Sequence, residues 1–371
     1  MNKTDFPPKT HPNTLKKGSV SCQAPSNIAL VKYWGKYGEQ LPQNTSVSFT
    51  LSKCRTETTL YYKKHPNGKA PAGAGQGGFN FETYLDGKRE TAFDAKINKF
   101  FQRIYGHAPF IKDYTFTIET KNTFPHSSGI ASSASGMGAL ALCISQMGFS
   151  LGNATTTAQQ NEQIFKKASF LARLGSGSAS RSIQGPLVVW GEHPKIAGSS
   201  NHFGIKYPHP VHSSFSNYRD TILLVDKGKK QVSSTLGHEL MHGHPYAATR
   251  FKEANKNVAK LIPVLKNGDI PAFIEIVESE ALQLHAMMMA SKPYFILMKP
   301  NTLKIINLIW EYRKTTGSNL CFTLDAGANV HVLYPGGETA AVSKFIAGQL
   351  AQYCKNGGYI NDRCGLGATI A

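Results

Sequence analysis

The length, composition and charge of the chain already exclude several classes of protein. It has 371 residues, 41% of them hydrophobic and 17% charged, which is typical of a globular protein and not of a disordered one. No apolar run approaches the roughly 18 residues of a membrane-spanning helix, and residues 1–18 lack the apolar middle of a secretory signal. We therefore expect no membrane partner. The six cysteines form no CxxC pair, so we expect reduced thiols in the cytoplasm.

The formal net charge of +18 favours a polyanionic partner, which is nucleic acid, anionic lipid or a phosphorylated small molecule. The lysines are scattered, with only short doublets such as Lys63–Lys64 and Lys229–Lys230, and there is no RNP-type sequence, zinc finger or basic helix. We therefore expect no nucleic-acid partner. A basic surface around a phosphate-binding cleft accounts for the sign of the charge equally well.

Strand and helix patterns alternate irregularly in the first half of the chain. Residues 1–18 are polar, and we expect a disordered basic tail. Alternating or β-branched residues predict strands at 19–24, 46–51, 56–62, 80–85, 115–120 and 187–190. Apolar residues at helical spacing predict helices at 91–105, from 137 onward and at 156–171.

A stretch rich in His, Ser and Pro at 193–217 is typical of a linker or long loop. After it, strands are predicted at 221–225, 320–324 and 330–334, and helices at 247–266, 269–289, 301–316 and 338–353. Strict βαβ alternation is missing, so the pattern indicates an α+β protein. We expect two halves that meet near residue 205, covering 19–205 and 206–371.

The glycines Gly73, Gly75 and Gly78 match a dinucleotide-binding fingerprint by letter only. They lead into the strand predicted at 80–85, whereas the fingerprint needs a helix N-terminus to meet a pyrophosphate. A glycine-rich hairpin loop is the better interpretation.

His238-Glu-Leu-Met-His242 is a literal HExxH, the signature of a zinc metalloprotease. That chemistry needs a continuous helix that presents both imidazoles one turn apart. Gly243 and Pro245 follow at once and would end such a helix. A zinc metalloprotease therefore stays an alternative function. The preferred interpretation of the motif is the start of a helix whose two histidines are solvated.

Two loops of small residues are candidates for anion binding. Ile130-Ala131-Ser132-Ser133-Ala-Ser135-Gly136 precedes a helix, whose first N–H groups and dipole suit a phosphate, with a Ser132 or Ser133 hydroxyl free to reach Mg²⁺. The alternative interpretation is that these small residues only allow the helix to pack closely against its neighbours. The second loop is Arg173-Leu-Gly-Ser176-Gly-Ser178-Ala-Ser-Arg181-Ser. Its hydroxyls and guanidinium suit a carboxylate or phosphate, and the alternative is an ordinary solvated loop.

Two further segments place charged groups beside strand ends. The first segment is Ala24-Pro-Ser-Asn27-Ile-Ala-Leu-Val-Lys32-Tyr33-Trp34-Gly-Lys36. Its lysine ammonium groups and its tyrosine hydroxyl suit a polyphosphate, while Trp34 could line a pocket or pack in the core. In Leu324-Asp325-Ala-Gly-Ala-Asn329 the small residues leave a carboxylate uncovered at a turn.

These four segments, in this order, together with Val232-Ser-Ser234-Thr, resemble the signature set of the mevalonate diphosphate decarboxylases of the GHMP kinase superfamily. The resemblance spans about residues 19–335. It implies a GHMP kinase fold, with a ribosomal-protein-S5-domain-2-like N-terminal half, a ferredoxin-like C-terminal half and the active site between them. It also implies a phosphorylated mevalonate as substrate, ATP as cosubstrate, Mg²⁺, and a homodimer.

The resemblance assigns roles residue by residue. Asp325 matches the catalytic aspartate that faces the 3-hydroxyl, Arg181 the arginine that holds the substrate carboxylate, and Asn27 the asparagine that positions this arginine. The expected substrate-binding residues are Lys32, Tyr33, Trp34, Lys36, Ser176, Ser178 and Ser234. The expected ATP-binding residues are Ala131, Ser132, Ser133, Ser135 and Gly136.

A few positions depart from the family pattern. Ser180 replaces a frequent Cys, Ala328 replaces Pro, and His238 stands where Met is common. The departures near the phosphate end of the substrate leave a monophosphate open beside the diphosphate. The alternatives within the superfamily are therefore a phosphomevalonate decarboxylase and a mevalonate 3-kinase, which phosphorylates without decarboxylation; retained Asp325, Arg181 and Asn27 argue against the kinase.

Overall fold

The computed structural model describes Phe6 and residues 15–66, 78–125, 130, 132–152, 158–226 and 234–371. The predicted tail at 1–18 lies largely outside this range, as do Gly73, Gly75, Ala131, Lys229 and Lys230. Of the tail, Phe6 packs on Phe170 with ring centroids 5.0 Å apart, and the first strand begins at Lys17. No helix in the described ranges is both long and apolar enough to cross a lipid bilayer.

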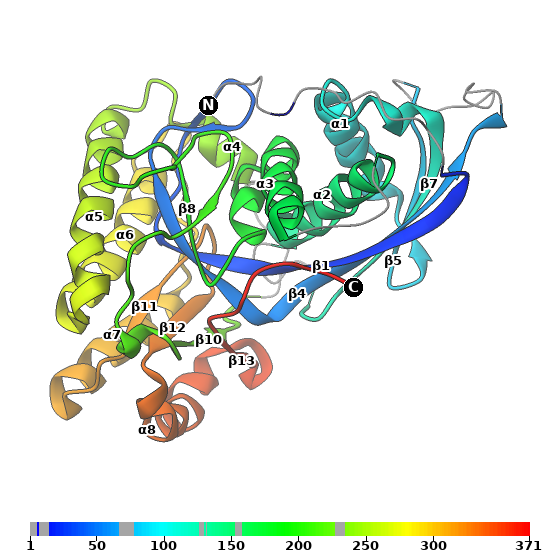
Figure 1. The fold of residues 1–371 in the computed structure, drawn as a ribbon. Helices are drawn as coiled ribbons and strands as arrows, with labels where there is room; N and C mark the ends of the chain where they lie inside the picture. Colours follow the sequence, from blue (N-terminus) through cyan, green and yellow to red (C-terminus); the bar gives the residue numbers. More distant parts are fainter. Residues whose placement is uncertain are drawn as a thin grey trace.

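The fold combines two β-sheets with helices, which confirms the expected α+β class (Figure 1). The larger sheet has the strand order β14-β1-β4-β7-β5-β6, with β8 paired to β4 and β9 paired to β8. Its strands are β1 (Lys17–Val31), β4 (Ser46–Lys64), β5 (Asn80–Leu85), β6 (Lys88–Arg89), β7 (Tyr114–Asn122), β8 (Leu187–Trp190), β9 (Ile205–Lys206) and β14 (Thr369–Ile370).

Three helices cover one face of this sheet: α1 (Asp94–Ile104), α2 (Ser132–Ser150) and α3 (Ala158–Gly175). Helix α2 is buried nearly all round, because Leu140, Ile144 and Met147 face the first hydrophobic core and its small residues lie against β1 and β4. Helix α1 is amphipathic and buries Ile97, Phe100, Phe101 and Ile104 in the same core. The described glycine of the dinucleotide-like motif, Gly78, leads into strand β5 and not into a helix.

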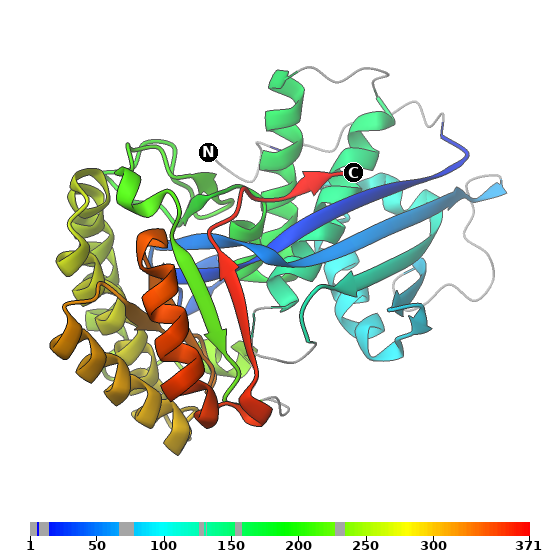
Figure 2. The ribbon, with the colours of Figure 1, turned by 90° about the horizontal axis from the view of Figure 1, so that it is seen from below.

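The second sheet has the order β11-β12-β10-β13 and is covered by α5 (Ala247–Asn267), α6 (Ile270–Met289), α7 (Pro300–Thr316) and α8 (Thr339–Phe345). Its strands are β10 (Arg219–Leu223), β11 (Cys321–Thr323), β12 (Val330–Tyr334) and β13 (Tyr359–Arg363). Figure 2 shows β10 and β13 side by side, although about 140 residues separate them in the chain. The helix expected at 338–353 is α8 followed by π-helical and 3₁₀ turns.

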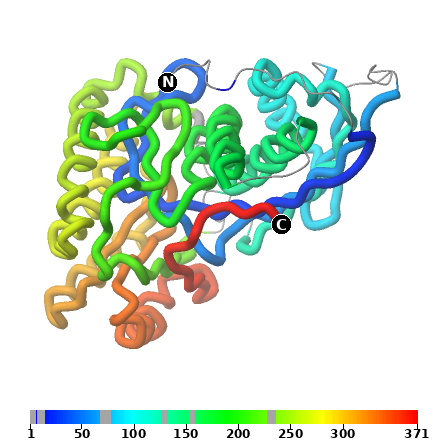
Figure 3. The backbone as a smooth tube through the Cα atoms, viewed as in Figure 1, coloured from blue at the N-terminus to red at the C-terminus, as the bar shows by residue number. Residues whose placement is uncertain are grey.

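The two halves share a core. Ile28 and Phe49 of the large sheet pack in one cluster with Leu261 of α5 and Phe273 of α6. The final strand β14 returns to the first sheet, where Cys22 pairs with Ile370, and Figure 3 shows this end of the chain beside β1. The two halves are therefore joined by side-chain packing and by strand pairing, and these contacts fix the position of one half relative to the other.

The strands expected at 46–51 and 56–62 form one strand, β4, so this prediction was wrong. The polar residues between them kept the local pattern from indicating a continuous strand. The backbone N–H groups of these residues find a partner that is distant in the sequence. The carboxylate of Asp362 on β13 accepts hydrogen bonds from the N–H groups of Ser52, Lys53 and Cys54 at 2.7–3.0 Å. Opposite this point, the pairing of β1 shifts register between Pro25 and Asn27.

Candidate active site

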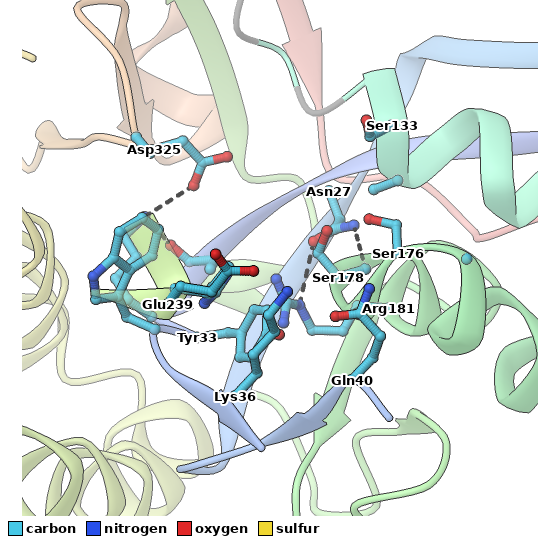
Figure 4. Close-up of a pocket in the computed structure, with 18 of the residues that line it drawn as sticks. Asn27, Tyr33, Lys36, Gln40, Ser133, Ser176, Ser178, Arg181, Glu239 and Asp325 are labelled. Atoms are coloured by element: carbon cyan, nitrogen blue, oxygen red, sulfur yellow. Dashed lines mark hydrogen bonds and ion pairs between the residues drawn. The ribbon is translucent and has the colours of Figure 1, made fainter. Parts of the chain in front are cut away.

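A cavity of about 920 Å³ lies between the two halves and brings the four sequence segments together. Figure 4 shows Asp325 on one side of it, and Arg181 with the serines of the loop after α3 on the other. Among the residues singled out from the sequence, those that line the cavity are Asn27, Lys32, Tyr33, Trp34, Lys36, Ser132, Ser133, Ser176, Ser178, Arg181, His238, His242 and Asp325. Ser135 and Gly136 do not line it, Ala131 lies outside the described residues, and the side chain of Ser234, the first residue of α4 (Ser234–Glu239), is not described.

Arg181 is held in one orientation by neighbouring polar groups. It lies in the 3₁₀ turn Gly177–Ser182, where its Nε donates to Asn27 Oδ1 at 3.3 Å and its Nη1 donates to Ser46 Oγ at 2.9 Å. Asn27 in turn donates to Ser182 Oγ at 2.8 Å. Burial lowers the pKa of Arg181 to about 10, against the raising effect of Asp325. Within the described residues Arg181 forms no ion pair, so the guanidinium is oriented and electrostatically available to an anion.

Asp325 lies at the turn after β11, where its backbone carbonyl accepts a hydrogen bond from His285 Nε2 at 3.1 Å. Its carboxylate is partly exposed to the cavity and lies 3.6 Å from the ammonium group of Lys32. Lys32 is buried and also donates from Nζ to the carbonyl of Ala29 at 2.6 Å. Burial lowers the pKa of Lys32 to about 8, while Asp325 and Glu280 raise it. A lysine of this kind can lose its proton in the neutral-to-alkaline range.

The N-terminus of α2 faces the cavity through Ser132 and Ser133, whose helix has 19 residues. The first N–H groups of such a helix lack partners in the helix and attract anions. Ser133 Oγ accepts a hydrogen bond from Lys96 Nζ at 2.7 Å. Ser135 points away from the cavity, since its hydroxyl shares a 2.6 Å hydrogen bond with Thr56 of β4.

A second pocket, of about 100 Å³, opens beside the same helix end and shares Lys96, Ser132 and Ser133 with the cavity. Gly136 lies on its wall. The remaining lining is largely apolar and comes from Leu85, Phe93, Ile97, Ile118, Met137 and Leu140, among others.

His238 is part of an aromatic wall and is not solvated, so that expectation was wrong. Its ring lies 4.2 Å from Tyr33 and 4.6 Å from Trp34 between centroids, and its Nδ1 accepts a hydrogen bond from the N–H of Gly35 at 3.0 Å. Burial, together with the positive charges of Lys36 and Arg181, lowers the pKa of His238 to about 3. Trp34 serves both expected purposes, because it lines the cavity and also packs in a hydrophobic cluster with Met287.

The HExxH motif does not form a zinc site. Helix α4 ends at Glu239, so the two histidines are not presented by one continuous helix, and His242 is exposed while His238 is buried. In the part of the chain that the structure describes, no three His, Cys, Asp or Glu side chains form a cluster able to hold a metal ion.

Several lining residues were missed by the sequence analysis. Lys96, Lys99 and Arg103 of α1 and Gln40 and Glu239 also face the cavity. Six of the lining side chains are cationic, namely Lys32, Lys36, Lys96, Lys99, Arg103 and Arg181, against the carboxylates of Glu239 and Asp325. The signal that could have found the α1 residues is their spacing, which places the three cations on one helical face. The cavity is thus suited to a ligand with several negative charges.

Two family models match the chain. The diphosphomevalonate decarboxylase-like N-terminal domain matches residues 24–201, and the mevalonate 5-diphosphate decarboxylase C-terminal domain matches residues 221–362. The diphosphomevalonate decarboxylase of Gibberella zeae is 30% identical over 329 residues, which cover 85% of this chain and 80% of that protein.

Solved structures of the same kind of enzyme share the fold. The mevalonate diphosphate decarboxylase of Staphylococcus aureus has a TM-score of 0.79 at 26% identity and covers 96% of this chain and 98% of its own. The structure of MDDEF in complex with MVAPP, AMPPCP and magnesium has a TM-score of 0.78 at 27% identity, covering 96% of this chain and 99% of its own. These likenesses confirm the GHMP kinase fold that the resemblance implied.

Proposed function

Since the chain belongs to the diphosphomevalonate decarboxylase family, we propose that it catalyses the ATP-dependent decarboxylation of mevalonate 5-diphosphate. The products are isopentenyl diphosphate, ADP, phosphate and CO₂, a step of isoprenoid biosynthesis by the mevalonate pathway. The observation that carries the proposal is the shared cavity, in which the carboxylate of Asp325 and the guanidinium of Arg181 face the same space.

Asp325 and Arg181 bind the two ends of the reacting part of the substrate. Asp325 accepts the proton of the 3-hydroxyl or orients it, and the ammonium group of Lys32 lies 3.6 Å from the Asp325 carboxylate. Arg181 holds the substrate carboxylate, and its hydrogen bonds to Asn27 and Ser46 fix the direction of the guanidinium. Positioning is its main contribution, because a very tight ion pair would oppose the loss of CO₂.

The reaction then proceeds in two stages. The oxygen of the 3-hydroxyl attacks the γ-phosphorus of ATP, ADP leaves, and the hydroxyl proton passes to Asp325. The C3–O bond next breaks with its electron pair on the departing phosphate. The bond between the carboxyl carbon and C2 breaks, its electrons form the C2–C3 double bond, and CO₂ is released.

The ATP phosphates are proposed to lie at the N-terminus of α2. The N–H groups of its first turn, the hydroxyls of Ser132 and Ser133, and the ammonium of Lys96 form a donor set that suits a triphosphate. Mg²⁺ would neutralise charge on the transferred phosphoryl group, with Ser132 or Ser133 as its protein ligand. The small apolar pocket beside Ser133 is of a kind that suits the adenine ring.

The rest of the substrate site follows the cavity lining. Tyr33, Trp34, Lys36, Ser176 and Ser178 are proposed to bind the substrate, and all of them line the cavity. The proposed roles of Ser234 and Ala131 rest on the family resemblance alone. The buried hydrogen bond of Ser135 favours a role in holding α2 on the sheet over direct ATP binding.

The decisive experiment measures ADP and CO₂ formation with mevalonate, its 5-phosphate and its 5-diphosphate. We expect equal amounts of ADP and CO₂, and the highest kcat/KM with the diphosphate. ADP without CO₂ would identify a mevalonate 3-kinase. A preference for the monophosphate would identify a phosphomevalonate decarboxylase. Zinc-dependent proteolysis without either product would refute the proposal altogether.

We also propose that the chain divides into domains at 19–205 and 206–371, and that it works in the cytoplasm as a homodimer without nucleic-acid or membrane partners. The junction lies between the two family-model matches, which end at 201 and begin at 221. Light scattering on the purified protein tests the dimer, and a mass of one chain at micromolar concentration would exclude it.

A further inference from the structure

Helix α6 packs against strand β1 of the first half and against strand β11 of the second half. Lys32 directly follows β1, and Asp325 lies at the turn after β11. The Lys32 ammonium and the Asp325 carboxylate lie 3.6 Å apart. The helix therefore contacts both segments that supply this pair, one from each half of the chain.

Glu280 of α6 holds Lys32 through its backbone. The Glu280 side chain is fully buried, and its Oε2 accepts a hydrogen bond from the N–H of Lys32 at 2.8 Å. The same carboxylate forms an ion pair with Arg250 of α5 and accepts a hydrogen bond from Asn257 Nδ2 at 2.7 Å. Asn44 Nδ2 donates to the carbonyl of Lys32 at 2.9 Å. The backbone of Lys32 is therefore held at both its N–H and its carbonyl.

His285, five residues further along α6, holds Asp325 through its backbone carbonyl. The distance from His285 Nε2 to that carbonyl is 3.1 Å, and because a carbonyl oxygen only accepts, the ring carries its proton on Nε2. Burial lowers the pKa of His285 to about 4, so the ring is a neutral donor near neutral pH and adds no charge beside Lys32. Leu284 falls between Glu280 and His285 in direction around the helix, and it lines the cavity.

The ion pair between Glu280 and Arg250 is poorly built for stability alone. In the ranges that the structure describes, Nε and Nη1 of Arg250 are buried without a hydrogen-bond partner. A buried ion pair stabilises a protein only when its remaining donors are satisfied, and an apolar pair of similar volume is often at least as stable. The contact with Lys32 gives the buried carboxylate a reason, because no apolar side chain could accept the Lys32 N–H or place a negative charge near its ammonium.

The charge of Lys32 depends on groups from several elements. Burial lowers the pKa of Lys32 to about 8, Asp325 and Glu280 raise it, and Arg181 lowers it. Arg250 is itself paired with Glu280. Without the negative charge of Glu280, the Lys32 ammonium would lose its proton at a lower pH.

We propose that Glu280 and His285 are positioning residues of the reaction, which together set the geometry of the Lys32 ammonium and the Asp325 carboxylate. Glu280 holds the Lys32 side through its hydrogen bond and its charge, and His285 holds the turn that carries Asp325. This inference rests on the proposed function, in which Asp325 faces the 3-hydroxyl of the substrate. A displacement of about 1 Å in such a group can lower a rate by about 100-fold.

The first test compares His285→Leu and His285→Gln with the wild-type enzyme. Leucine removes the donor to Asp325, so we expect kcat to fall about 30-fold, while the KM values for ATP and for mevalonate 5-diphosphate change by less than about threefold. Glutamine can donate to the same carbonyl through its amide nitrogen, so His285→Gln should recover most of the lost kcat.

His244→Leu is the matched control for this test. His244 is also buried, its Nε2 lies 3.1 Å from the backbone carbonyl of Met287, and neither residue lines the cavity. Thermal unfolding should show a comparable loss of stability in His244→Leu and His285→Leu. The kcat of His244→Leu should nevertheless stay within about threefold of the wild type.

The second test uses Glu280→Gln, which keeps an acceptor for the N–H of Lys32 but removes the negative charge. The alkaline limb of the kcat profile should move to lower pH by about one unit. The free energy of unfolding provides a measurement that does not depend on activity. It should rise with pH once Lys32 loses its proton in the folded protein, because the unfolded chain keeps this proton to higher pH. In Glu280→Gln this rise should begin about one pH unit lower than in the wild type.

Glu278→Gln is the matched control for the second test. Glu278 is a buried carboxylate of the same helix, it is paired with Arg313, and it does not line the cavity. Both pH profiles of Glu278→Gln should therefore match those of the wild type. If Glu280→Gln does not fold because Arg250 keeps an uncompensated charge, Glu280→Gln combined with Arg250→Met removes both charges and should shift the profiles in the same direction.

Identical pH profiles of the wild type and the Glu280 variant would overturn the role of Glu280. For His285, an unchanged kcat in His285→Leu, no recovery with glutamine, or an equal loss of kcat in His244→Leu would show a structural role only. If the wild type forms neither ADP nor CO₂ from any mevalonate derivative, the proposed function fails. The pH dependence of unfolding still tests the contact between Glu280 and Lys32 in that case.

Discussion

Replacement of Arg181 by Gln separates the stability of the protein from its activity. Arg181 is buried with hydrogen bonds to Asn27 and Ser46, but no described carboxylate forms an ion pair with it. Burial lowers the pKa of Arg181 to about 10, which corresponds to a cost of about 3 kcal/mol for keeping the guanidinium charged in the folded protein. Because the folded pKa remains about 10, this cost is present at every pH near neutrality.

Arg181→Gln removes that cost and gives up hydrogen bonds worth about 1 kcal/mol each. The glutamine amide can still reach one of the two partners, so only one hydrogen bond is lost, and we expect the free protein to gain about 2 kcal/mol of stability, or a rise of about 2–4 °C in Tm. Turnover should fall at least 100-fold or so, because the substrate carboxylate loses its oriented partner. The stabilisation that mevalonate 5-diphosphate gives to the wild type should also be lost.

The assay is thermal unfolding with and without substrate, combined with CO₂ release. Arg173→Gln is the matched control, since Arg173 is also buried, burial likewise lowers its pKa to about 10, and it donates to the carbonyls of Glu39 and His202 outside the cavity lining. Its turnover should stay within about threefold of wild type. A clear drop in Tm for folded Arg181→Gln would refute the electrostatic reasoning, and near-normal turnover would remove Arg181 from the site.

Four further predictions concern Asp325, Lys32 and Gly177. Asp325→Asn should lower turnover by about 10³-fold or more while calorimetry still detects ATP binding, and loss of nucleotide affinity would contradict the assigned role. The rate should decline as pH rises through about 8, where the buried Lys32 loses its proton, and Lys32→Met should remove this alkaline limb from the pH profile. The same pKa makes the unfolded chain bind more protons than the folded one between about pH 8 and 10.5, so the free energy of unfolding should rise with pH there, and rise less in Lys32→Met. Gly177→Ala should destabilise the protein by about 1–3 kcal/mol and raise the substrate KM, because the added methyl carbon would lie 2.7 Å from the Tyr33 hydroxyl. Gly337→Ala, where a methyl group meets nothing within 4 Å, is its control in thermal unfolding, and equal Tm values for the two variants would contradict the packing argument.

The elements with a strong internal period could be predicted from the sequence. Helices α5, α6 and α7 and strands β5 and β12 lie within two residues of the expected bounds, because each carries its own apolar face or alternation. Strand β13 was not predicted, since its sequence Tyr-Ile-Asn-Asp-Arg is polar. It forms because β10 pairs with it and because its Asp362 satisfies backbone groups of β4.

The sequence by itself determined the family and singled out the candidate reactive groups, because rare combinations of residue types such as those around Asn27, Arg181 and Asp325 are local and need no knowledge of the fold. Only the tertiary structure decided which charges face the cavity. From the sequence, Lys99 and Arg103 look like part of an ordinary solvated helix face, and only the packing of α1 places them along the cavity. His238 is expected from the sequence to be solvated, but the structure buries it, and its Nδ1 accepts a hydrogen bond from Gly35. The physical reason is that side-chain chemistry and periodicity are properties of short segments, whereas burial, hydrogen-bond partners and pKa depend on segments that only folding brings together.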